Sequence, residues 1–239
     1  MTTNRDADEN PCAECEVRGL ALCGALEPDE LGPLTALTSE VIVQPMETVI
    51  YEDDPAKHLF IVKEGVARLT KILPDGRRQI TGFLFPGDFL GLGHGATYGY
   101  SAEAVTPLAL CRIERNRMDE LLAASPKLEH RMVSIASNEV ARAQEQLLLL
   151  GRKTARERVA NLLMQLVGEL EKRKLPIKPL DLPMTRADMA DYLGLTIETV
   201  SRILARLAQD GVIALETPQR VIIKDKNRLA AIAEAEEGA

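Results

Sequence analysis

The stretch MTRADMADYLGLTIETVSRILARLAQDGVI, residues 184–213, carries the strongest structural signal in this chain. Thr185 is a good helix N-cap with Asp188 three residues later, so a first helix is predicted to begin there. Gly194 falls where two helices must turn sharply, and Thr196 can cap the next helix. Because apolar residues recur at helical spacing on both sides of this turn, the stretch predicts a helix-turn-helix.

The second helix of this pair has a polar face that carries Glu198, Ser201 and Arg202. In a major groove, Arg can bond guanine, a carboxylate can accept a hydrogen bond from cytosine and Ser can bond several base edges. Phosphates would repel Glu198, so this set favours base reading over backbone binding. The alternative is an ordinary surface pair between Glu198 and Arg202, which lie four residues apart.

The segment VIALETPQRVIIKDKNRLAAIA follows and predicts two short strands around a turn at Thr217 and Pro218, then a last short helix. This order is typical of a winged helix-turn-helix. Arg220, Lys224 and Lys226 are candidates for phosphate contacts, with a solvated wing as the alternative.

Residues 41–113, further upstream, consist of short apolar runs separated by Gly, Pro and Asp, which predicts short strands. The run LPDGR, residues 73–77, has the residue types of a hairpin turn. An antiparallel barrel or jelly roll is the natural way to close so many short strands.

A long helix is predicted next, because residues 128–150 contain neither Gly nor Pro. An almost heptad stripe follows one face of it: Met132, Ala136, Val140, Ala143, Leu147 and Leu150. Packing on the chain's own barrel would explain this stripe, but its narrowness and small residues favour a seam between two subunits. A second helix and a Pro-rich connection, residues 175–183, lead to the helix-turn-helix.

Composition restricts the class of protein. The chain has 239 residues, 46% of them hydrophobic, which is enough for two domains. No apolar run approaches the roughly 20 residues that cross a bilayer, and the first ten residues lack signal-peptide features. We therefore expect a cytoplasmic protein without membrane association. The net charge is −7, yet residues 151–239 hold 15 Lys and Arg against 13 Asp and Glu, so the C-terminal part suits nucleic acid better.

Enzymatic activity is not expected. The three histidines, His58, His94 and His130, are scattered without ligand spacing, and His94 in a Gly-rich loop is expected to be exposed. The sequence also lacks a nucleophile elbow, a phosphate-binding loop and a paired-carboxylate motif, so no catalytic residues are assigned.

Three of the four cysteines crowd into CAECEVRGLALC, residues 12–23, and the fourth is Cys111. A structural disulfide framework is not expected in a reducing compartment, which leaves metal binding, redox sensing or simple burial. Four thiolates are the complement of a [4Fe-4S] cluster, but zinc also binds four cysteines. Local spacing leaves these alternatives open.

The order of barrel, long helix and winged helix-turn-helix resembles the cyclic-AMP receptor protein and FNR superfamily of bacterial transcription regulators over nearly the whole chain. The segment YLGLTIETVSRILARL, residues 192–207, is most similar to the recognition segment of the oxygen-responsive FNR branch. In that branch a Glu is followed, after any two residues, by Ser and Arg, and Glu198, Ser201 and Arg202 match this pattern. The resemblance implies a palindrome of TTGAT-type half-sites, with Arg202 on guanine, Glu198 on the opposing cytosine and Ser201 on a thymine.

The resemblance implies an α+β fold in which a homodimer binds double-stranded DNA and contacts RNA polymerase. Its expected parts are a cysteine-rich cluster-binding segment (1–30), an antiparallel β jelly-roll sensor domain of the cyclic-nucleotide-binding type (31–125), a dimerisation helix (126–151) and a winged helix-turn-helix domain (152–239).

The same resemblance implies a cofactor. Family members hold an oxygen-labile [4Fe-4S] cluster through three N-terminal cysteines and a distant one in the barrel, which here correspond to Cys12, Cys15, Cys23 and Cys111. Oxygen would then control dimerisation and DNA binding. A thiol-based redox regulator and a zinc-stabilised regulator are the alternatives of the same fold. A cluster-carrying redox enzyme is the alternative from another class, but it would not need Glu198, Ser201 and Arg202 on one helix face.

Two departures from the family's patterns matter. Cyclic-nucleotide members hold the phosphate with an Arg in the barrel, whereas this chain has no Arg between Pro86 and Leu110, so we expect no cyclic-nucleotide binding. FNR proteins often carry an Asp on the dimer helix whose charge opposes pairing, and Ala143 occupies that place here. We therefore expect dimerisation to depend less on the cluster than in relatives with the Asp.

Overall fold

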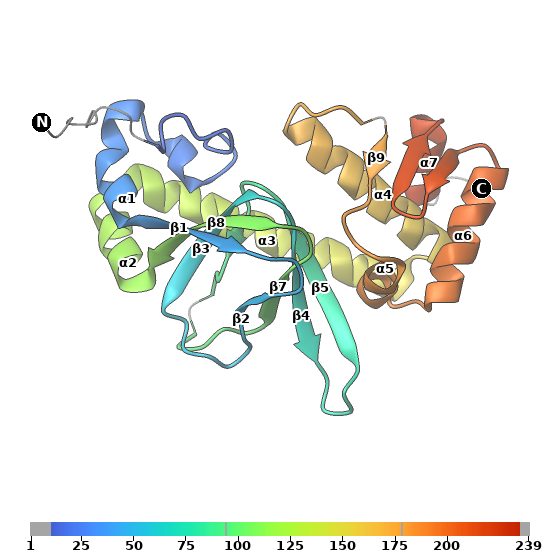
Figure 1. The fold of residues 1–239 in the computed structure, drawn as a ribbon, viewed down its shortest axis with the longest axis horizontal. Helices are drawn as coiled ribbons and strands as arrows, with labels where there is room; N and C mark the ends of the chain where they lie inside the picture. The colour runs from blue at the N-terminus through green and yellow to red at the C-terminus, as the bar shows by residue number, and fades with distance from the viewer. Residues whose placement is uncertain (1–10, 94, 178, 235–239) are drawn as a thin grey trace, which may run out of the picture. The chain divides into compact units, whose positions relative to one another are not determined.

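The structure is a computed structural model that describes residues 11–93, 95–177 and 179–234 (Figure 1). The expectations for His94 and for the first ten residues lie outside this described part. The chain divides into two compact units, residues 1–70 with 83–140 and residues 71–82 with 141–239. The predicted hairpin around residues 73–77 therefore groups with the C-terminal unit, and the unit boundary falls within the long helix.

The barrel consists of two antiparallel sheets of four strands each. The first has the order β1 (Thr38–Val43), β8 (Leu108–Glu114), β3 (His58–Glu64) and β6 (Phe89–Leu90). The second has the order β2 (Thr48–Ile50), β7 (Ser101–Ala104), β4 (Ala67–Ile72) and β5 (Arg78–Leu84). The antiparallel jelly roll predicted from the short apolar runs is confirmed.

Alternation along the strands gives the first sheet two buried faces. Phe60 and Leu110 point between the two sheets and belong to the barrel core. Their neighbours Ile61 and Ile113 point to the opposite face and belong to a second apolar cluster. Short helices from two parts of the chain cover that face. Three precede the first strand, η1 (Leu22–Ala25), η2 (Pro28–Glu30) and α1 (Gly32–Leu37), and the fourth, α2 (Arg115–Ala124), follows β8. The N-terminal cysteine segment therefore packs against the outside of the barrel.

Helix α3 (Pro126–Arg152) is the predicted long helix, and α4 (Ala155–Lys172) follows it after a break at residues 153–154. Thr154 caps α4, because its hydroxyl accepts from the Glu157 N–H while the Glu157 carboxylate accepts from the Thr154 N–H. Within the part of the chain that is described, no helix is long and apolar enough to cross a membrane.

The C-terminal unit contains the predicted helix-turn-helix and wing. Its helices are α5 (Arg186–Leu193), α6 (Ile197–Gln209) and α7 (Lys226–Glu234), and its strands are β9 (Leu180–Asp181), β10 (Ile213–Thr217) and β11 (Arg220–Ile223). The sheet order is β10-β11-β9. The third strand, β9, was missed because two residues in a Pro-rich connection show no periodic pattern. Leu180 pairs with Val221, and this pairing forms the strand.

Candidate nucleic-acid interface and cysteine group

Local hydrogen bonds build the helix-turn-helix as its sequence predicts. The Thr185 hydroxyl accepts from the Asp188 N–H, and the Asp188 carboxylate accepts from the Thr185 N–H. Gly194 ends α5 with φ 63° and ψ 42°, a left-handed conformation that strains any other residue. The Thr196 hydroxyl then accepts from the Thr199 N–H at 3.2 Å and caps α6.

Helix α6 turns one face inward and leaves the other in solvent. Val200, Leu204 and Leu207 are buried, which fixes the orientation of the helix. Glu198, Ser201 and Arg202 are all exposed on the opposite face, as their spacing predicts. The structure therefore presents the three candidate base-reading side chains together on one surface.

The charge state of Glu198 fits an acceptor role. Its own main-chain N–H, the Thr196 hydroxyl and the charge of Arg202 lower the pKa of the Glu198 carboxyl. Arg202 Nε donates to the Glu198 main-chain oxygen at 3.3 Å. The carboxylate is thus ionised at neutral pH, when it can only accept hydrogen bonds, as contact with a cytosine amino group requires.

Arg206 also belongs to the exposed surface of α6 and was not singled out from the sequence. Its Nε lies 3.4 Å from Asp210 Oδ1, and Arg156 Nη2 lies 3.1 Å from the other carboxylate oxygen, Asp210 Oδ2. The position of Arg206 one helical turn after Arg202 is the signal that could have identified it.

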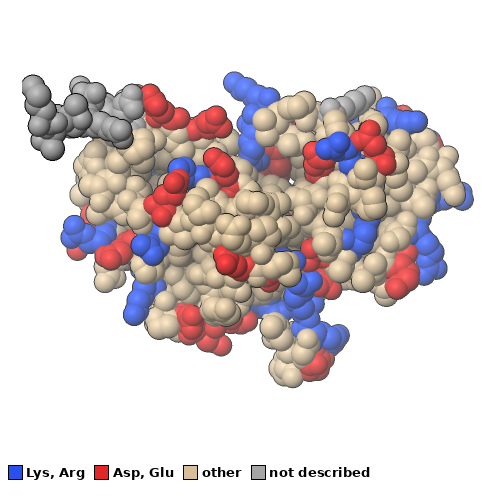
Figure 2. Space-filling view, viewed as in Figure 1, with Lys and Arg blue, Asp and Glu red and all other residues tan. Residues whose placement is uncertain are grey.

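Two of the three cations proposed for phosphate contacts, Arg220 and Lys226, form ion pairs with carboxylates of this chain. Arg220 Nε donates to Asp181 Oδ1 at 2.7 Å, and Lys226 pairs with Glu171. These pairs favour the solvated-wing alternative for Arg220 and Lys226. Figure 2 likewise shows acidic and basic side chains interspersed, without a continuous patch of one sign on the face in view.

The four cysteines, called here the cysteine group, lie near one another on the outer face of the barrel: Cys12, Cys15, Cys23 and Cys111. Cys23 is part of the second apolar cluster, and Cys12 and Cys111 pack against it. Burial, followed by the nearby Cys15 and Cys12, raises the pKa of the Cys23 thiol to about 11. Burial also raises the pKa of Cys111 to about 11, with Lys63 opposing and the other three cysteines adding to the shift. Cys23 and Cys111 are therefore each close enough to Cys12 and Cys15, and to one another, to interact electrostatically.

Protonation and nearby charge bear on whether the cysteine group could serve as a set of thiolate ligands. Raised pKa values mean that Cys23 and Cys111 are protonated at neutral pH, so binding of a metal centre must release protons. Lys63 and Arg18 are the nearby cations, and both stabilise thiolates. Within residues 11–93, 95–177 and 179–234, no group of three or more His, Cys, Asp or Glu residues is placed to hold a single metal ion.

The base of α3 contacts the same segment. Arg131 Nη2 donates to the Leu20 carbonyl at 2.7 Å, and Lys127 pairs with Glu30 at 2.6 Å. Met132 packs against the second apolar cluster. The first turns of α3 are thus bonded directly to the segment that carries three of the cysteines.

The exposed apolar stripe of α3 differs at its ends from the predicted seam. Val140 and Leu147 are 58% and 72% exposed, and Ala136 and Ala143 are exposed as well. Met132 and Leu150 are only half-buried, whereas Val133 is 59% exposed. Five solvent-facing apolar positions recur at spacings of three and four: Val133, Ala136, Val140, Ala143 and Leu147. A partner subunit on this face stays a prediction.

The chain was compared with known proteins. Residues 157–232 match the model of the Crp-like helix-turn-helix domain, and residues 40–125 match the model of the cyclic nucleotide-binding domain. The chain is 41% identical over 221 residues to the transcriptional activatory protein AadR of Rhodopseudomonas palustris, and the match covers 92% of each chain. This chain belongs to the Crp/FNR family. The family resemblance inferred from the order of elements and the recognition segment is confirmed.

Other members of the Crp/FNR family are similar over most of their length. The transcriptional activator protein FnrL of Cereibacter sphaeroides is 40% identical over 223 residues, covering 91% of this chain and 90% of that protein. The structure of FixK2 from Bradyrhizobium japonicum has a TM-score of 0.77 and 33% identity, covering 82% of this chain and 96% of that chain. This Crp/FNR protein is therefore a transcription regulator with a DNA-binding helix-turn-helix, and not an enzyme.

The match to the cyclic nucleotide-binding domain concerns the fold of the barrel. Arg115 lies near the loop after β6, but its guanidinium donates to the carbonyls of Ala56, Gly91 and Gly93 at 2.6 to 2.9 Å. Those bonds hold the backbone of the loop. That this Crp/FNR regulator binds no cyclic nucleotide stays a prediction.

Proposed function

We propose that this Crp/FNR regulator is an oxygen-responsive transcription activator that binds a TTGAT-type palindrome as a homodimer while its [4Fe-4S] cluster is intact. The ligands would be the cysteine group: Cys12, Cys15, Cys23 and Cys111. The observation that carries this proposal is the position of the cysteine group against the base of α3, a helix whose exposed face is apolar. The names of relatives such as FnrL support the activator role and the contact with RNA polymerase that it requires.

The residues around the cysteine group can connect ligand binding to α3. The cluster would supply an oxygen-labile centre that joins four thiolates. Ligation would tie the N-terminal segment to β8 through Cys111. Arg131 bonds that segment to α3, so its ordering favours one placement of the helix base. Conformations competent for DNA binding would then gain population according to the free energy by which ligation favours them.

The α3 stripe and α6 together fit DNA recognition by a two-fold dimer. A seam along α3 would bury Val140 and Leu147, which are otherwise exposed to water. Two-fold symmetry then gives two copies of α6, which can enter successive major grooves about one helical turn apart. The palindromic target follows from the same symmetry.

Anaerobic purification with iron and sulfide analysis tests this proposal, followed by binding to a TTGAT palindrome before and after exposure to air. We expect bound iron and sulfide, and specific binding that is lost in air. Iron-free protein that changes affinity reversibly with thiol reagents would instead support a thiol sensor. Retained zinc with air-stable binding would support the zinc-stabilised regulator.

Glu198→Ala should lower discrimination at the cytosine position of the half-site by about ten-fold, because one base-specific acceptor is lost. Competition binding against palindromes substituted at each position measures this. Glu120→Ala is the matched control, since it removes an exposed carboxylate from α2, far along the chain from the helix-turn-helix. A uniform change across all sequences would contradict base reading by Glu198.

Wild-type protein without its cluster should remain largely dimeric in air, because Ala143 places no charge on the exposed stripe. Ala143→Asp should make the cluster-free protein monomeric, since the charges would face each other across the seam. Sedimentation velocity of both proteins measures this, with Ala141→Asp as a control on the same helix but off the stripe. A clean monomer for the wild-type protein would contradict the expectation.

A further inference from the structure

The C-terminal end of α5 is held by side chains from three different elements. The last carbonyls of a helix have no partner within the helix and need one elsewhere. Here the donors are Gln79 to the Asp191 oxygen, Gln146 to the Tyr192 oxygen and Arg158 to the Leu193 oxygen. These donors belong to β5, α3 and α4, so the barrel hairpin, the long helix and the following helix all converge on one helix end.

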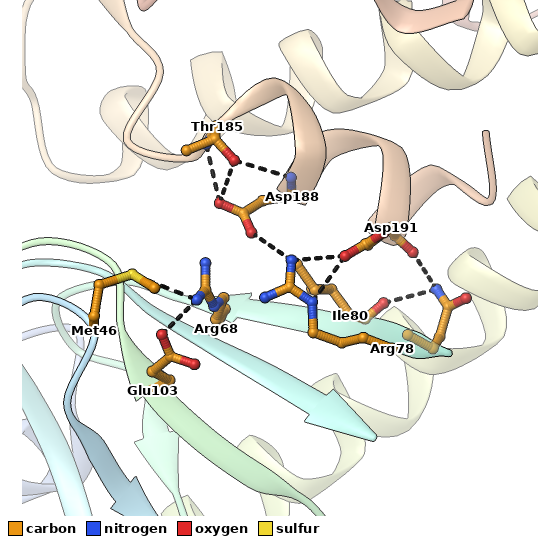
Figure 3. Close-up of polar contacts among 9 residues, drawn as sticks. Met46, Arg68, Arg78, Ile80, Glu103, Thr185, Asp188 and Asp191 are labelled. Carbon is orange, nitrogen blue, oxygen red and sulfur yellow. Dashed lines mark hydrogen bonds and ion pairs between the residues drawn. The ribbon is translucent and has the colours of Figure 1, made fainter. Parts of the chain in front are cut away.

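Arg78 of the hairpin also binds α5, through two carboxylate side chains of that helix (Figure 3). Its Nε donates to Asp191 Oδ2 at 2.8 Å, and its Nη2 lies 3.1 Å from Asp188 Oδ1. Asp188 is only 1% exposed, and its other carboxylate oxygen accepts from Thr185 in the capping box. A buried carboxylate requires a compensating charge, which Arg78 supplies.

Helix α6 must follow any movement of α5. The turn between them is short and centred on Gly194, whose left-handed conformation leaves little freedom for other arrangements. Buried Ala190 and Leu193 of α5 and Val200 and Leu204 of α6 form part of the apolar interior. Close packing of this kind transmits displacement instead of absorbing it. The orientation of the base-reading face is therefore set by whatever holds α5.

The hairpin that holds α5 is continuous with the barrel. Residues 71–82 group with the C-terminal unit, but β4 begins at Ala67 and β5 ends at Leu84, and both ends belong to the barrel unit. Helix α3 reaches the same point, because a side chain at position 194 would meet Leu150 Cδ2 at 3.4 Å. The hairpin, at Gln79, and the end of α3 thus both lie at the α5–α6 turn, within the C-terminal unit.

We propose that Arg78 and Gln79 are positioning residues for DNA recognition, through which the β4–β5 hairpin sets the orientation of α6. This inference rests on the proposed base-reading function of Glu198, Ser201 and Arg202. Neither hairpin residue needs to touch DNA. Their role is to hold α5, and with it α6, in the orientation that DNA recognition requires.

Arg78→Gln and Gln79→Leu in the full-length, anaerobically prepared dimer test this inference, with the TTGAT palindrome as the probe. Each variant should bind the palindrome about ten-fold more weakly, which is the scale of one charge-assisted or buried hydrogen bond. Arg77→Gln is the matched control, because Arg77 lies in the same hairpin but is 75% exposed and pairs with its neighbour Asp75. It should leave the affinity unchanged.

Two further measurements separate positioning from other roles. The slope of log affinity against log salt should be unchanged in Arg78→Gln, whereas loss of a direct phosphate contact would reduce it by about one. Amide hydrogen exchange without DNA should become faster at residues 193–199 in both variants. The charge-exchanged double variant Arg78→Asp with Asp191→Arg should recover part of the affinity that Arg78→Asp loses.

Unchanged affinity together with unchanged exchange in both variants would overturn the inference, and so would a reduced salt slope. If Arg78→Gln proves too unstable to purify, Gln79→Leu decides the outcome, because it keeps the ion pairs of Arg78. Failure of the wild-type protein to bind the palindrome would overturn the proposed target instead, while the exchange measurement would still report on positioning.

Discussion

Cys111→Ser should abolish iron and sulfide binding and lower affinity for the TTGAT palindrome about a hundred-fold, near the upper end of typical allosteric coupling. Cys111 lies within β8, where it pairs with Glu40 of β1 and Ile61 of β3, so its position is rigid. It is the cysteine that would anchor the N-terminal part of the ligand set to the barrel. Serine is nearly isosteric, and the fold should persist.

Colorimetric iron and sulfide analysis and fluorescence anisotropy measure both effects of Cys111→Ser under anaerobic conditions. Ala109→Ser is the matched control, because it adds a hydroxyl two residues away on the same face of β8 while leaving every thiol in place. Full iron content in Cys111→Ser would remove Cys111 from the ligand set. Loss of iron with unchanged DNA affinity would separate the cluster from regulation.

Leu147→Asp should raise the dissociation constant of the dimer by about a thousand-fold or more. Leu147 is 72% exposed in the single chain, so it is available to a partner on the α3 stripe. Each of two subunits would lose the burial of a leucine, worth about 1.5 to 3 kcal/mol, and would place a carboxylate in the seam. DNA affinity should fall in parallel, because a monomer presents only one α6.

Sedimentation equilibrium of Leu147→Asp measures dimerisation, and anisotropy with the palindrome measures binding. Leu175→Asp is the matched control, since Leu175 is also exposed, at 49%, but lies in the connection after α4. A dimer of wild-type strength in Leu147→Asp would show that the α3 stripe is not the subunit seam.

The helix-turn-helix was predicted closely because its signals are local. The caps at Thr185 and Thr196 and the turn at Gly194 each depend on residues within four positions. The exposed set on α6 followed from helical periodicity alone. The ends of the α3 stripe were harder to predict, because periodicity does not reveal that Met132 packs against the chain's own apolar cluster.

Only part of the candidate site could be predicted, because some of its contacts join residues far apart in the sequence. Spacing pointed to four cysteines without choosing among cluster, zinc and thiol chemistry, and the place of Cys111 came from family resemblance. The carboxylates facing Arg220 and Lys226 belong to other elements, β9 and α4, so a linear reading left these cations available for phosphates.

The sequence by itself determined the class of fold, the exposed face of α6 proposed for recognition and the candidate cysteines, because capping, turn chemistry and periodicity act over a few residues. Only the tertiary structure decided which strand brings Cys111 to the N-terminal cysteines and which hairpin reaches α5. Arg78 and Asp191 are 113 positions apart, and no local preference encodes such a pair. Strand pairing and packing bring these residues together, and those contacts depend on the whole chain.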